Sequence, residues 1–494
     1  MSIAKELENL DALSQADLVH RKEVKPSELV EAAIGRIERI NSKLNAVIHT
    51  VYDQAFRAAG AWEAEIRAGR AGNVPFCGVP FLLKDLLAEC KDTPFNEGSK
   101  AVKGYVSKLD SEIVKRQKAG GLIVLGKTNT CEFGLLPTTE PALFGATLNP
   151  WNTALTAGGS SGGSAVAVAS GMLPMAHGSD GGGSLRIPAS CCGIFGFKPS
   201  RGRNPFGPLF GEAAGGLAHE HAVSRTVRDS AALLDLTSGP DVGDPYFAPP
   251  KERAYLEETS RDPGRLRIGF LSSVPDGWHK ETDLHPDCAE AVEDAANLCE
   301  SLGHTVEAVD SKLFSDAAIG GVFGKLFDAY AAHVFEYWKR ELGREITEDQ
   351  VEPFSWESAR RGLKMSAGKY LQAQEDMHRF SRKIAAWYED GRYDVLLTPT
   401  MRIAPVAIGS FRSTAQNPMG WLEPTISFVV FTRVQNMTGQ PAMSVPLFWN
   451  RDNIPIGVQF AAKFGEEGIL FRLAAQLESA RPWQNRKAPH WIQY

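Results

Sequence analysis

The sequence predicts an α/β protein built as one large domain. A helical pattern over Asp287–Leu302 is followed by an apolar run at Thr305–Val309. A second helical pattern over Ser111–Gly120 is followed by a short apolar strand at Leu122–Leu125, and such alternation is typical of α/β folds. The 494 residues are 43% hydrophobic and 23% charged, which is the composition of a globular protein with a large core. No proline-rich or charged linker divides them, so we expect a single domain over residues 1–494.

Helical periodicity dominates two other parts of the chain. Apolar residues recur at spacings of three and four within residues 1–70, which we expect to form a helical N-terminal region. The aromatic-rich stretch Phe314–Asp390 has the same periodicity, and it makes up most of a largely helical insert at residues 310–422. The remaining predicted elements are strands at Leu266–Phe270, Val395–Thr400 and Ile456–Phe460, and helices at Ser164–Leu173, Ser224–Leu236 and Gly468–Leu477.

Charge and cysteine content argue against several classes of protein. A net charge of −6 gives no reason to expect binding to nucleic acid or to an anionic membrane surface. No apolar run reaches the roughly 20 residues of a membrane span. The seven cysteines are an odd number without repeating spacing, and the chain opens with a charged pattern, so we expect a cytoplasmic protein. No cluster of cysteine and histidine has zinc spacing, so we expect no metal.

Glycine and serine are concentrated in residues 157–200, where they bring no benefit to a regular fold. The runs GGSSGG at 158–163 and DGGGS at 180–184 flank a small-residue apolar segment. Three successive glycines, Gly181, Gly182 and Gly183, indicate a sharp turn that exposes backbone N–H groups. Such donors stabilise the oxyanion of an acyl-transfer intermediate. Ser184, which follows them directly, is the natural nucleophile.

A serine nucleophile needs a base, and the chain offers two kinds of candidate. His177 lies in a small-residue segment, His219 and His221 share a stretch that we expect to be a loop, and no GxSxG motif surrounds Ser184. Lys84 lies in the apolar run GVPFLLKDLL, where burial would disfavour the ammonium form and lower its pKa. We therefore favour Lys84 as the base.

Five segments carry a resemblance to a known family. They are GVPFLLKDL at 78–86, GKTNTCEF at 126–133, the long Gly/Ser stretch, NMTGQPAMSVP at 436–446 and IPIGVQF at 454–460. The chain resembles the amidase signature family of serine hydrolases over nearly its whole length. The resemblance implies a large mixed, mainly parallel twisted sheet covered by helices on both faces. It also implies that the insert at residues 310–422 shapes the substrate entrance.

The resemblance also implies roles for individual residues. The family's Ser–cis-Ser–Lys triad falls on Ser184 as nucleophile, Ser160 as bridging serine after a cis peptide bond from Gly159, and Lys84 as base. The family's oxyanion loop falls on Gly181, Gly182, Gly183 and the Ser184 amide, although the family usually has threonine or isoleucine where Gly181 stands. Three supporting residues are expected, namely an ion pair of Asp180 with Arg186 and a secondary hydrogen-bonding group at Ser161.

The expected activity is hydrolysis of the C–N bond of a small, largely neutral amide through an acyl-enzyme, without metal or organic cofactor. The segment at 178–203 further resembles the bacterial branch that includes cyclic nylon-oligomer hydrolases. Candidate pocket walls are apolar, which favours neutral substrates over free glutamine. These candidates are Leu135, Leu136, Phe144, Phe206 and Phe210. A small-molecule amide is the expected partner, and a homodimer is left open.

Three alternatives remain at this point. The chain could be a glutamine-dependent amidotransferase subunit that works with a partner on aminoacyl-tRNA. Residues 121–128, GLIVLGKT, satisfy the Walker A pattern around Lys127, which makes a P-loop nucleotide-binding protein a second alternative. The four residues between the two glycines are strand formers, which argues against a phosphate loop. A non-catalytic binding protein is the third alternative, and the retained triad residues argue against it.

Overall fold

A large mixed sheet forms the centre of the protein. The computed structural model describes residues 7–316, 318–420 and 422–492. The sheet has eight strands in the order β4-β6-β5-β10-β11-β9-β7-β8. Their bounds are β4 Met175–Asp180, β5 Phe195–Lys198, β6 His219–Ser224, β7 Arg267–Phe270, β8 Thr305–Ala308, β9 Val395–Pro399, β10 Ala442–Trp449 and β11 Pro455–Ala462. The α/β class and the large mixed sheet predicted from the sequence are thus confirmed.

The expectation that the sheet is mainly parallel is wrong. Only β7 pairs in parallel, with β8 and with β9, whereas the other pairings within this sheet are antiparallel. A parallel pair needs a long crossover, which α10 provides between β7 and β8. Strands β10 and β11 are instead joined by the short turn Asn450–Ile454, which permits only antiparallel pairing.

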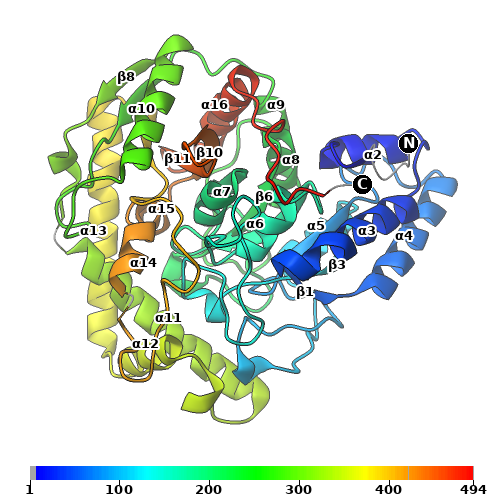
Figure 1. The fold of residues 1–494 in the computed structure, drawn as a ribbon, viewed down its shortest axis with the longest axis horizontal. Helices are drawn as coiled ribbons and strands as arrows, with labels where there is room; N and C mark the ends of the chain where they lie inside the picture. The colour runs from blue at the N-terminus through cyan, green and yellow to red at the C-terminus, as the bar shows by residue number, and fades with distance from the viewer. Residues whose placement is uncertain (1–6, 317, 421, 493–494) are drawn as a thin grey trace.

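Helices cover both faces of the sheet (Figure 1). Their bounds are α2 Ala12–His20, α3 Pro26–Leu44, α4 Tyr52–Arg67, α5 Glu112–Ala119, α6 Gly162–Ala169, α7 Arg186–Cys192, α8 Val227–Thr237, α9 Tyr255–Glu258, α10 Pro286–Ser301, α11 Ile319–Leu342, α12 Pro353–Leu363, α13 Ala367–Gly391, α14 Leu422–Val429, α15 Thr432–Thr438 and α16 Glu467–Ala480. Side chains of α6 and α7 belong to one hydrophobic core, and those of α8, α10 and α16 belong to another. On β5, Phe195 and Phe197 enter the second core. Gly196 between them faces α7, where a Cβ would lie only 2.6 Å from the Ala189 Cβ.

A second, three-stranded sheet in the order β1-β3-β2 lies with the N-terminal helices (Figure 1). Its strands are β1 Val47–Thr50, β2 Pro80–Lys84 and β3 Ile123–Thr128. Strand β3 pairs in parallel with β2 and contains Lys127. That lysine is fully buried, and its Nζ donates to the Ala88 carbonyl at 2.6 Å. Because Lys127 lies within a strand rather than in a loop before a helix, the Walker A interpretation is wrong.

The second half of the chain adds a layer of long helices beside the sheet (Figure 1). Helices α11, α12 and α13 confirm the helical prediction for Phe314–Asp390. Helices α11 and α12 pack so closely that a Cβ at Gly362 would collide with the carbonyl of Asp328. Within the ranges described above, no helix is both long and apolar enough to cross a bilayer.

Candidate active site

Lys84 is the last residue of β2, and its side chain is 0% exposed. Its Nζ donates to Ser160 Oγ at 2.7 Å and to Ser179 Oγ at 2.9 Å. Burial lowers the pKa of Lys84 to about 7, although the nearby acidic groups Asp180 and Glu220 act in the opposite direction. Near neutral pH a large share of Lys84 is therefore an uncharged amine, which is the form that can accept a proton.

Ser160 lies just before α6, and the Gly159–Ser160 peptide bond is cis, as expected. A Cβ on Gly159 would collide with the backbone of Thr138, so only glycine fits at this position. The next residue, Ser161, connects the start of α6 to strand β4 and to the turn that follows it. Its Oγ donates to the Ser179 carbonyl at 3.1 Å, and its amide donates to the Ser184 carbonyl at 3.3 Å. Together with the bonds of Lys84, these contacts bring residues from β2, the start of α6 and the turn after β4 together.

Ser184 lies in the turn between β4 and α7 and borders the cavity described below, with 8% of the residue exposed. The turn is held from within by Asp180, whose carboxylate accepts from the amides of Gly183 at 2.8 Å and Leu185 at 3.1 Å. Thr432 adds a hydrogen bond to the Gly182 carbonyl at 2.6 Å. The nucleophile candidate is thus on a rigid turn.

The predicted ion pair of Asp180 with Arg186 is present and fully buried. Arg186 Nη2 donates to Asp180 Oδ1 at 2.8 Å, and Nε donates to Oδ2 at 3.0 Å. Burial alone would raise the pKa of Asp180, but the adjacent guanidinium outweighs it and holds this pKa well below its usual range. Arg186 also donates to Gln459 at 2.6 Å and to Asn436 at 2.8 Å. These two amides were not selected from the sequence, although both lie in the C-terminal motif segments.

The backbone amides near Ser184 differ in their availability. The Gly183 N–H donates to the Asp180 carboxylate, so the expectation that it forms part of an oxyanion hole needs correction. In the described part of the chain, the amides of Gly181, Gly182 and Ser184 donate to no other protein group. These three N–H groups remain available to an oxyanion, whereas the N–H of Gly183 is occupied by the Asp180 carboxylate.

Two further residues of β4 contact Lys84. Ser179 accepts from its Nζ, as described above, and His177 lies against its backbone. The stretch with His219 and His221 forms strand β6 rather than the loop that we expected, and His177 lies opposite on β4. His177 Nδ1 accepts from the Lys84 amide at 3.3 Å, and its Nε2 lies 3.2 Å from Glu220 Oε1. Burial lowers the pKa of His177. Its place behind Lys84 is fixed by strand pairing, which no local sequence signal indicated.

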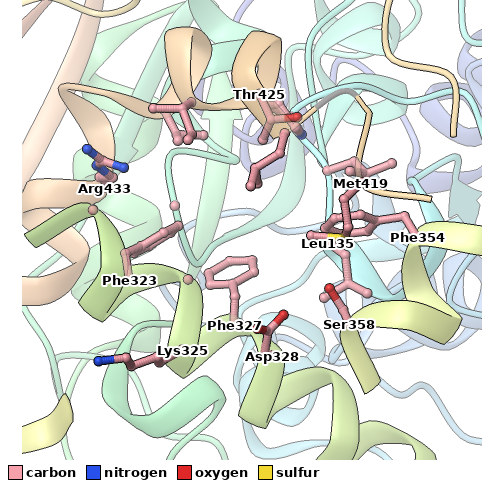
Figure 2. A pocket seen from close by; sticks show the side chains of 18 of the residues that line it. Leu135, Phe323, Lys325, Phe327, Asp328, Phe354, Ser358, Met419, Thr425 and Arg433 are labelled. Carbon is pink, nitrogen blue, oxygen red and sulfur yellow. The ribbon is translucent and has the colours of Figure 1, made fainter. Parts of the chain in front are cut away.

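A cavity of about 320 Å³ opens beside Ser184. Its walls come from α11, α12, α14 and the segment 134–137 (Figure 2). Phe323 and Phe327 of α11 face it, as do Leu135, Phe354 and Met419 (Figure 2). A Cβ at Gly321 or Gly324 of α11 would meet nothing within 4 Å, so these glycines keep space open. The helical insert thus supplies much of the wall.

The predicted wall residues are only partly correct. Leu135 and Leu136 line the cavity. Phe144 packs edge-on against His49. Phe210 packs against Tyr337 at a depression separate from the cavity beside Ser184. Phe206 also lies at another depression. Closeness in sequence to the Gly/Ser stretch therefore did not predict which aromatic rings lie near Ser184.

Charged groups are few along this apolar wall. Asp328 and Arg361 form an ion pair at 3.0 Å, and Lys325 and Arg433 are the other charged residues that border the cavity in the described ranges. Arg433 donates to the Trp278 carbonyl. No group of three or more potential metal ligands occurs among the residues that the structure describes.

Comparisons with known proteins agree with this geometry. Residues 28–471 match the family described as Amidase. The chain is 38% identical over 486 residues to 6-aminohexanoate-cyclic-dimer hydrolase of Paenarthrobacter ureafaciens, covering 97% of this chain and 96% of that protein. A solved structure of 6-aminohexanoate cyclic dimer hydrolase with substrate superposes with a TM-score of 0.92 at 37% identity, covering 98% and 100% of the two chains. A bacterial aryl acylamidase of the amidase signature family gives a TM-score of 0.86 at 27% identity, covering 96% of each chain.

Fold and similarity together define a hydrolase that acts on carbon–nitrogen bonds of amides. More narrowly, the chain belongs to the amidase family, as its motif segments indicated.

Proposed function

We propose that this protein hydrolyses small uncharged amides, cyclic ones in particular, through an acyl-enzyme on Ser184. The observation that carries the proposal is the contact of a buried lysine with a serine: Lys84 Nζ lies 2.7 Å from Ser160 Oγ and has a pKa of about 7. A neutral amine at hydrogen-bond distance from a hydroxyl is a suitable general base at physiological pH.

In the proposed acylation, Ser184 Oγ attacks the amide carbonyl carbon while its proton passes to Ser160. The Ser160 proton moves in turn to neutral Lys84. The relay then reverses and protonates the amide nitrogen, the C–N bond breaks, and the acyl group remains as an ester on Ser184. Water attacks this ester and loses its proton by the same route, which releases the acid and restores the serine.

The negative charge that develops on the carbonyl oxygen is assigned to the amides of Gly181, Gly182 and Ser184. These N–H groups are on a turn that Asp180 and Thr432 already hold, so they need not reorganise as charge develops. One such donor typically contributes about 3–4 kcal/mol to transition-state stabilisation.

Two observations support the proposed substrate class, namely the cavity and the similarity to the cyclic-dimer hydrolases. The wall beside Ser184 is formed mainly by aromatic and aliphatic side chains, which favour an uncharged aliphatic or aryl acyl group and disfavour the charged backbone of free glutamine. The relatives at 38% identity are named for a cyclic amide dimer. We therefore place cyclic amides of ω-amino acids, followed by uncharged linear amides, first among candidate substrates.

The test compares kcat/KM of the purified chain for the cyclic dimer of 6-aminohexanoate, a neutral anilide and free glutamine, without added partners. The expected order places the neutral amides well above glutamine. A preference for glutamine would contradict the proposal and favour the amidotransferase subunit. Ser184→Ala serves as the control, because any turnover that survives it does not come from this site.

A further inference from the structure

One carboxylate borders the mainly apolar cavity beside Ser184. Asp328 lies on α11 and borders the same cavity as the nucleophile. Among the lining residues that the structure describes, Asp328 is the one acidic side chain. Figure 2 shows its carboxyl group beside Ser358, on the same stretch of α11 as Phe327. The amide hydrolysis proposed above gives this group no role.

The backbone of Asp328 is held by the packing of α11 on α12, and its carboxylate takes part in an ion pair. Arg361 of α12 pairs with its carboxylate at 3.0 Å, and the close packing at Gly362 leaves no room between the helices. The Arg361 side chain is 45% exposed, whereas the Asp328 side chain is 9% exposed. The guanidinium therefore approaches from the solvent side, and the carboxylate is the more enclosed member of a pair that borders the cavity.

A cyclic amide presents the enzyme with a difficulty that an open-chain amide does not. When Ser184 takes the acyl group, the ring C–N bond breaks, but the freed amine remains attached to the acyl-enzyme through the rest of the ring. A tethered amine has a high effective concentration. Its lone pair can attack the ester, reform the ring amide and return the serine, so that nothing is hydrolysed.

From this juxtaposition, and resting on the proposed function, we infer that Asp328 is a binding subsite for the aliphatic ammonium group freed by ring opening. The nitrogen receives one proton through the relay when the C–N bond breaks, and a second from a solvent water to become ammonium, with the resulting hydroxide released to the bulk solvent. A carboxylate beside it favours the charged form. The ammonium has no lone pair, so the ester remains for water to hydrolyse.

An open-chain amide has no such requirement, because its leaving amine diffuses away. The inference therefore predicts an effect that depends on whether the leaving group is tethered. A merely structural role for Asp328 would impair both kinds of substrate alike.

The experiment compares Asp328→Asn with the wild-type protein on two substrates. One is the cyclic dimer of 6-aminohexanoate, and the other is the open-chain dimer with its amino end acetylated and its carboxyl end as N-methyl amide. We expect kcat for the ring to fall about tenfold, the effect of losing one charged hydrogen bond, and kcat for the open chain to change by less than about twofold. Hydroxylamine, which captures the acyl group faster than water, should raise ring consumption by a larger factor in Asp328→Asn than in the wild type.

Arg361→Met is the matched control. It removes the other member of the pair and leaves the carboxylate available, so ring opening should remain at or above the wild-type rate. An equal loss on both substrates in Asp328→Asn, an absence of selective hydroxylamine rescue, or an equal loss of ring opening in Arg361→Met would each overturn the inference while leaving the proposed function intact. Failure of the wild type to open the ring, with open-chain cleavage retained, would remove the cyclic-substrate proposal and this inference together.

Discussion

Lys84 Nζ and Ser160 Oγ lie 2.7 Å apart in a fully buried contact, although 76 positions separate the two residues in the chain. Strand β2 brings the lysine, and the turn before α6 brings the serine. If this contact is the proton relay, Ser160→Ala and Lys84→Ala should slow acylation by about three orders of magnitude without unfolding the protein. Ser184→Ala should abolish it. A fluorophosphonate adduct mapped by mass spectrometry to a serine other than Ser184 would contradict the assignment.

The pH dependence of activity should have an acid limb set by Lys84. Burial lowers the pKa of this lysine to about 7, and only the neutral amine can accept a proton. As pH falls through 7 the amine becomes protonated, so kcat/KM should decrease about tenfold per unit below it. A pH profile of kcat/KM on a neutral, non-titrating amide measures this limb. A flat profile between pH 5 and 8 would count against Lys84 as the base.

Substitution by alanine should affect activity differently at two glycines of the turn between β4 and α7. A Cβ at Gly181 would meet only Phe327 Cζ at 3.8 Å, which is ordinary contact. Gly183 has φ of +130° and lies against Thr432, so a side chain there is both strained and obstructed. Gly181→Ala should keep kcat/KM within about threefold of wild type, whereas Gly183→Ala should lose about a hundredfold. Thermal melts of both variants separate a displaced turn from global unfolding.

Loss of Arg186 should destabilise the fold strongly and change its pH dependence. Arg186→Met leaves the buried Asp180 carboxylate without its cation, which typically costs about 3–5 kcal/mol. In the wild type, where Arg186 lowers the pKa of Asp180, this carboxylate's contribution is present above about pH 4 and is lost as pH falls. In the variant, burial without the guanidinium raises the pKa of Asp180, so acid should stabilise the variant relative to neutral pH. Urea unfolding of the wild type and the variant at pH 5 and pH 8 measures how the free energy of unfolding of each changes with pH. Arg186→Lys is the charge-retaining control.

Replacing a glycine of α11 with alanine should stabilise the protein but weaken its binding of bulky substrates. Gly321 and Gly324 are inside the helix, and a Cβ at either would enter open space near the cavity. Alanine favours a helix over glycine by about 1 kcal/mol, so Gly324→Ala should raise the melting temperature. It should also narrow the cavity and raise KM for a bulky ring more than for a small linear amide. Equal KM changes for both substrates would show that α11 does not limit substrate size.

Much of the secondary structure could be predicted because its signals are local. The helical periodicity of Phe314–Asp390 is confirmed, as is that of the N-terminal region apart from strand β1, since amphipathic spacing depends only on nearby residues. Residues 1–6 of that region lie outside the described ranges. Strands β4 and β6 were missed because they are buried on both faces and lack alternation. The mainly parallel sheet implied by the resemblance was wrong for a different reason: the direction of pairing depends on connections between distant segments, which the motif segments do not reveal.

Motif and residue type alone identified the family, Lys84, Ser160 and Ser184 as the residues to examine, and Asp180 with Arg186 as a pair. Chemistry requires those residue types, and the glycines around them are recognisable in one dimension. Only the tertiary structure decided that Gly183 donates to Asp180 and that His177 lies behind Lys84. It also decided that Asp328 shares a cavity with Ser184. These relationships join segments up to 144 positions apart, and they arise when burial of apolar surface packs helices and strands together, which the linear order of residues does not specify.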